Sequence, residues 1–123
     1  MKTIVIPGKF PTLNELIDAN RQNRHSGNKL KQESQRRIVD VLVLSDLGQQ
    51  DRPIKLHYRY YEPKANRDMD NVSGFFHKVF QDALVAVGYI PNDNWRYIKG
   101  FTDDFYLDRE NPRIEITIER ITE

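Results

Sequence analysis

The chain has 123 residues, of which 38% are hydrophobic and 30% charged, and its formal net charge is +1. This length and composition are typical of one globular domain, and no apolar stretch approaches the roughly 20 residues of a membrane-spanning helix. The absence of cysteine excludes disulfides, thiolate zinc sites and cysteine nucleophiles, and near-neutral charge argues against indiscriminate coating of nucleic acid. We expect a cytoplasmic protein, because residues 1–7 are too short and strand-like for a signal peptide.

The first half of the chain is predicted to contain two strands and two helices. An apolar run at residues 3–6 predicts a short strand, and a capping turn at residues 11–14 leads into a first helix. A longer helix is expected over about residues 28–47, and its apolar part, residues 38–44, is expected to be buried. Alternation of apolar and polar side chains over residues 53–61 predicts a half-buried strand.

The second half is predicted to contain one helix and two strands. Apolar residues recur at helical spacing over residues 75–87, and Gly88 is expected to end that helix. Residues 95–107 suit a strand or a bent hairpin, and residues 113–119 alternate as a strand with one buried face. The order β-α-α-β-α-β-β predicts an α+β fold in which helices cover a mixed sheet, with residues 1–123 forming one domain.

Positive charge is concentrated in one segment, residues 21–37, whereas acidic residues outnumber basic ones seven to three over residues 103–123. Such a segment is either the solvated face of a helix or a surface that contacts phosphates. Its basic residues, set against the single Glu33, are Arg21, Arg24, Lys29, Lys31, Arg36 and Arg37.

Acidic residues flank the helix expected at residues 75–87. Asp68 and Asp70 alternate along an extended segment before it, so their carboxylates point the same way, and Asp93 follows it. Three carboxylates that converge would bind a hard cation such as magnesium and support phosphodiester hydrolysis. A calcium-binding EF-hand is excluded, because its glycine and glutamate positions hold Ser73 and Val79.

An ordinary structural role for these acids stays open. Asp70 or Ser73 would cap the following helix, Asp68 would face solvent in a turn, and Asp93 would form part of a turn. Against this interpretation, the acids are placed at the ends of elements that we expect to meet. Carboxylates held close together repel, so a site that gathers them usually binds a cation.

A longer set of residues around the acids resembles the RusA family of Holliday junction resolvases. The resemblance covers most of the chain and includes Pro11, Asn14, Arg67-Asp68-Met69-Asp70-Asn71, Lys78, Asp82-Ala83-Leu84, Gly88 and Asn92-Asp93. It implies a small homodimer, active in DNA recombination and repair, that binds four-way junctions and cuts two strands symmetrically. The implied cofactor is Mg²⁺, with Mn²⁺ as a substitute.

The resemblance implies metal ligation by Asp70 and Asp93, with Asp68 as a further ligand or as the group that orients the attacking water. The family commonly has two acids after the glycine, whereas this chain has Asn92 before Asp93. Only Asp93 of this pair is therefore expected to be a charged ligand, with Asn92 a possible neutral one.

Two cations near the acids have alternative roles. Lys78 is expected to stabilise the transition state or the leaving oxygen, or else to form a surface ion pair with Asp82. It follows the aspartates about one turn later than in the family, which suggests an insertion in residues 72–76. Arg67 is expected to grip a DNA phosphate, or else to balance the charge of the neighbouring acids.

Several aromatic residues offer a surface on which opened DNA bases could stack, although their strand and helix spacing favours a place in the core. They are Tyr58, Tyr60, Tyr61, Phe75 and Phe76. Two functions remain as alternatives to a resolvase: a module that binds branched DNA without cutting it, and a nuclease that acts on flaps, forks or duplex.

Overall fold

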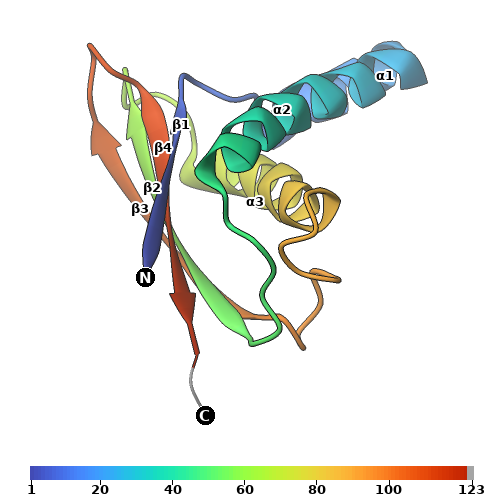
Figure 1. Cartoon of the computed structure of the whole chain (residues 1–123). Coiled ribbons are helices and arrows are strands. Elements are labelled where there is room, and N and C mark those ends of the chain that lie inside the picture. Colours follow the sequence, from blue (N-terminus) through green and yellow to red (C-terminus); the bar gives the residue numbers. More distant parts are fainter. Residues whose placement is uncertain (122–123) are drawn as a thin grey trace.

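Three helices lie on one face of a four-stranded mixed sheet (Figure 1). The computed structural model describes residues 1–121, and the strands are arranged in the order β1-β4-β2-β3. In chain order the elements are β1 (Lys2–Pro7), α1 (Leu13–Gln22), α2 (Arg24–Ser45), β2 (Ile54–Glu62), α3 (Met69–Ala86), β3 (Ile98–Leu107) and β4 (Arg113–Arg120). The predicted α+β class and element order are confirmed. None of the helices within residues 1–121 is both long and apolar enough to cross a membrane.

The β2-α3-β3 unit forms the centre of the fold. Strands β2 and β3 are parallel, with Ile54 paired to Ile98 and Glu62 paired to Leu107. Parallel strands need a crossover connection, and α3 provides it by returning along the sheet from the end of β2 to the start of β3. The core between α3 and the sheet includes four of the five aromatic residues considered above, Tyr58, Tyr60, Phe75 and Phe76, each at most 1% exposed.

Two details differ from the sequence-based predictions, and one pair of alternatives is decided. Helix α2 begins at Arg24 rather than near residue 28, because the Asn23 side chain accepts a 2.8 Å hydrogen bond from the backbone N–H of Ser26 and caps the helix. Its apolar end is not buried on all sides, since Val43 is 65% and Leu44 88% exposed. Residues 98–107 form one strand rather than a bent hairpin.

Residues 72–76, where an insertion is expected, are helical, because α3 continues without a break from Met69 to Ala86. Gly74 marks the place where α1 packs against α3. A Cβ atom added to Gly74 would lie 2.5 Å from Cδ1 of Leu13, so the close approach of the two helices requires a residue without a side chain.

The sheet face opposite the helices carries paired charges. Arg113 donates hydrogen bonds of 2.8 Å to both Asp108 and Glu115, and its guanidinium lies 3.8 Å from the ring centroid of Tyr61. Glu115 also accepts a 3.4 Å hydrogen bond from Arg59. The hydrogen bond from Arg113, followed by that from Arg59, lowers the pKa of Glu115 below its ordinary value of 4.5.

We expect this pairing to make stability sensitive to acid. Because the folded pKa of Glu115 is depressed, its contribution is fully present above the ordinary value of 4.5 and is lost as the pH falls through the lower folded value. Urea unfolding of the native chain and of Glu115→Gln should therefore differ by up to about 1 kcal/mol at pH 7, and the difference should shrink as the pH falls below 4.5. A difference that stays constant over this range would contradict the assignment.

Candidate functional site

Asp68 and Asp70 lie at the start of α3, where the chain turns back from the end of β2. Asp68 is the N-cap residue in extended conformation, yet its side chain makes no capping hydrogen bond, and Asp70 lies in the first turn. Both residues are exposed. The expected extended segment therefore ends at Asp68, because Asp70 is already helical. Neither Asp70 nor Ser73 is the helix cap, since both lie inside α3, and Asp68 is exposed to solvent.

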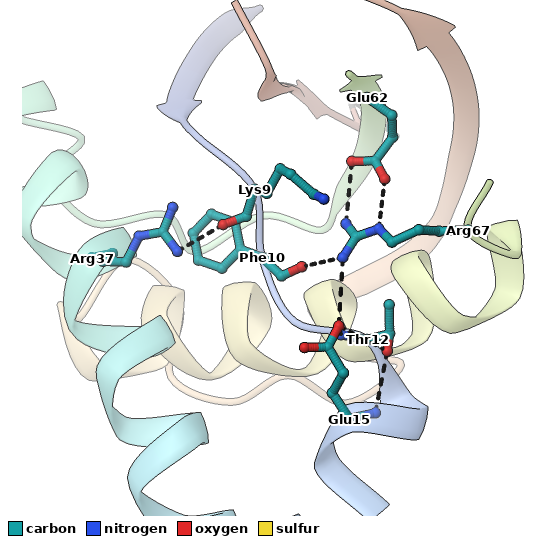
Figure 2. Close-up of polar contacts among 7 residues, drawn as sticks. All are labelled: Lys9, Phe10, Thr12, Glu15, Arg37, Glu62 and Arg67. Carbon is teal, nitrogen blue, oxygen red and sulfur yellow. Dashed lines mark hydrogen bonds and ion pairs between the residues drawn. The ribbon is translucent and has the colours of Figure 1, made fainter. Parts of the chain in front are cut away.

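The residue before this pair, Arg67, is held inside the protein (Figure 2). Its Nε and Nη2 donate hydrogen bonds of 2.7 and 3.2 Å to the two carboxylate oxygens of Glu62, and Nη1 donates one of 2.8 Å to the carbonyl of Phe10. Nη1 also lies 3.7 Å from Glu15, which forms a capping box with Thr12 at the start of α1. Arg67 thus ties the end of β2, the β1–α1 loop and α1 to the segment that carries the acids.

These contacts correct one of the two sequence-based roles of Arg67, the charge balance with the neighbouring acids. Its ion-pair partners are Glu62 and Glu15 rather than Asp68 and Asp70, and its side chain is only 16% exposed. Sequence reasoning missed Glu62, although a signal was present. Glu62 continues the alternation of inward-facing residues in β2, and a carboxylate at an inward position needs a cationic partner.

Helices α1 and α2 fold back on each other through Asn23 and project beyond the sheet as a hairpin (Figure 1). At its base, Arg37 donates hydrogen bonds of 2.9 and 3.0 Å to the carbonyls of Lys9 and Pro7, and its guanidinium lies 3.8 Å from the ring centroid of Phe10 (Figure 2). Partial burial lowers the pKa of Arg37. Arg37 therefore anchors the loop before α1, which is a structural role.

The other five basic residues of this segment are exposed along the hairpin: Arg21, Arg24, Lys29, Lys31 and Arg36. Lys29 lies 3.9 Å from Glu33, a solvent-exposed contact that leaves most of its charge accessible. The base of α1 contacts Arg67 through Glu15, so the hairpin that carries these basic residues starts beside the segment with Asp68 and Asp70.

Asp93 lies at the opposite end of the sheet. The segment that contains it is fixed there at both ends, because the backbone N–H of Gln50 bonds the carbonyl of Tyr89 and that of Ile54 bonds the carbonyl of Tyr97. The 18 residues of α3 separate Asp93 from the Asp68 segment, a helix length of about 27 Å at ~1.5 Å per residue.

The expectation that the helix brings all three acids together is therefore wrong for a single chain. A crossover helix carries the chain away from the end of one strand, so residues that flank it are separated by its length. Within residues 1–121, no three His, Cys, Asp or Glu side chains lie close enough to hold a metal ion. One copy of the chain does not form the three-carboxylate magnesium site.

Lys78 also lies apart from the two N-terminal acids. It follows Asp70 by eight positions in a continuous helix, or about 12 Å along the axis. Its Nζ lies 3.3 Å from Asp82, and its side chain is 61% exposed. The structure thus contains the surface ion pair considered as the alternative for Lys78.

No protein-family model matches the sequence, and no match was found among curated proteins. The resemblance to the RusA family therefore rests on the motif residues alone, and the activity that it implies is a proposal.

Proposed function

We propose that the protein is a magnesium-dependent endonuclease that works as a homodimer on four-way DNA junctions. The observation that carries this proposal is the position of the exposed, uncapped pair Asp68 and Asp70 beside the base of a projecting basic hairpin. Carboxylates suited to a divalent cation therefore lie where the hairpin starts, and the exposed cations suited to DNA phosphates lie along that hairpin.

The proposal requires a second copy to complete the acidic site. If two copies place their α3 helices antiparallel about a two-fold axis, Asp93 of one copy approaches Asp68 and Asp70 of the other, and two equivalent sites result. An apolar side chain close to Asp93 supports such contact, since Trp95 is 88% exposed. The role of magnesium, or of manganese in its place, depends on this assembly.

The function is tested with a labelled four-way junction and purified protein in the presence of magnesium. We expect two symmetrically placed nicks in opposing strands, because a two-fold dimer presents two equivalent sites to two phosphates. The nicks should disappear when EDTA removes the metal, while junction binding persists. Cutting of flaps, forks or duplex without paired symmetric nicks would indicate a nuclease of another specificity.

One alternative, a module that binds branched DNA without cutting it, is favoured by a specific observation. In a single copy Asp93 is remote from the other acids, and Lys78 is paired with Asp82. This alternative predicts tight junction binding and no nicking with magnesium or manganese, so the same assay separates the two functions.

A further inference from the structure

A cleft of about 400 Å³ opens at the carboxyl ends of the parallel strands β2 and β3, beside the acidic pair. Its lining includes Lys64, Asp68, Met69, Tyr106 and Leu107. The volume falls in the range of about 300–1,000 Å³ that is usual for small-molecule sites. The carboxyl ends of parallel strands are also where ligands usually bind to sheets of this kind.

The walls of this cleft are unusually apolar for an exposed surface. Met69, Tyr106 and Leu107 are 61%, 46% and 56% exposed. Large apolar side chains that gather around one opening at the surface indicate a binding site. Tyr106 is held in place by stacking on Tyr61, with ring centroids 5.0 Å apart, so this wall needs little ordering when a ligand binds.

The charges around the cleft limit what it can bind. Glu62 and Arg67, which also line it, neutralise each other, and Arg67 is already bound to Phe10 as well. Lys64 remains exposed and is the one lining cation that makes no ion pair among the residues that the structure describes. Asp68 adds one exposed carboxylate to the lining. One ammonium and one carboxylate beside apolar walls suit a flat ring, with a phosphate on the side of Lys64, better than a free phosphate, which would need several donors.

We propose that the cleft receives a DNA base that has left the helical stack, at a nucleotide next to the phosphate approached by Asp68 and Asp70. This inference rests on the proposed function and names the part of the DNA that the site recognises. A stacked and paired base cannot enter a cleft in the protein surface, so the ligand is an unpaired base at the branch point. Lys64 would contact the phosphate of that nucleotide.

The test compares two metal-free four-way junctions that carry unpaired nucleotides at the crossover. One has normal bases there, and the other has abasic residues with the same phosphates. We expect the native protein to bind the first about 5- to 150-fold more tightly, which is the range for stacking one base on protein side chains. Leu107→Asp should bind both junctions with the same, lower affinity.

Leu44→Asp is the matched control, because Leu44 is an apolar side chain on α2, 88% exposed and absent from the cleft lining. It should retain the preference for the junction with bases. Lys29→Gln, on the hairpin, should weaken binding to both junctions by a similar factor, since a phosphate contact does not depend on the base. Circular dichroism checks that each variant is folded.

The outcomes separate this inference from the proposed function. If the native protein binds both junctions equally, or if Leu107→Asp keeps the full preference, the cleft does not bind a base, although the junction is still bound. If neither junction is bound by the native protein, the proposed function and the role of the cleft are both overturned.

Discussion

Equimolar mixing of Asp70→Asn and Asp93→Asn chains should restore junction nicking that neither variant performs alone. Each variant by itself is expected to lose at least about 100-fold in nicking rate, because a carboxylate proposed to bind the metal is replaced by an amide. In a mixed dimer, one site combines the intact Asp70 of the first chain with the intact Asp93 of the second. The other site carries both substitutions.

The restored activity has a specific signature. Random exchange of subunits gives about half mixed dimers, each with one intact site, so products should carry a nick in one strand rather than paired nicks. Both variants alone should bind the junction at least as tightly as the native protein, because loss of a negative charge near DNA reduces repulsion. Gel analysis of the labelled strands measures both the number of nicked strands and the binding of the junction.

Mixing distinguishes a shared site from sites within each chain. If the three acids met within one chain, both sites of every mixed dimer would contain a substitution and the mixture would stay inactive. The design is possible because α3 separates Asp93 from Asp68 and Asp70 in a single copy. Inactivity of the native protein itself would instead favour the DNA-binding module.

Arg67→Ala is expected to lower the free energy of unfolding by about 3–5 kcal/mol, because it leaves the carboxylate of Glu62 buried without a cation. The side chains of Arg67 and Glu62 are only 16% and 11% exposed, and the guanidinium also donates to the Phe10 carbonyl. The loss would be a large part of the roughly 5–15 kcal/mol that stabilises a typical domain. Urea unfolding provides the measurement.

Two further variants test this explanation. The double variant that combines Arg67→Met with Glu62→Leu should recover much of the stability, because it leaves no buried charge unpaired. Lys78→Ala provides a surface control, since the Lys78–Asp82 pair is largely exposed and its loss should cost less than about 1 kcal/mol. If Arg67→Ala weakened DNA binding but left unfolding unchanged, the sequence-based role of Arg67 as a phosphate contact would be correct.

Much of the fold followed from the sequence because its signals are local. The alternation over residues 53–61 places inward and outward side chains in β2, and the apolar spacing of residues 75–87 predicts most of α3. The start of α2 lies about four residues before the predicted one because Asn23 caps the helix. The close packing of Gly74 against α1 could not be predicted, because its partner, Leu13, lies far away in the sequence.

The sequence by itself determined the α+β class, the order of the elements and the presence of an acidic pair at the start of α3. These features depend on side-chain periods of 2 and 3.6 residues and on neighbours within one or two turns. Tertiary structure alone decided that Glu62, rather than the adjacent acids, pairs with Arg67, and that Asp93 lies at the far end of the sheet. The reason is physical: a crossover helix separates the residues at its two ends, whereas strand pairing joins segments that local patterns do not relate.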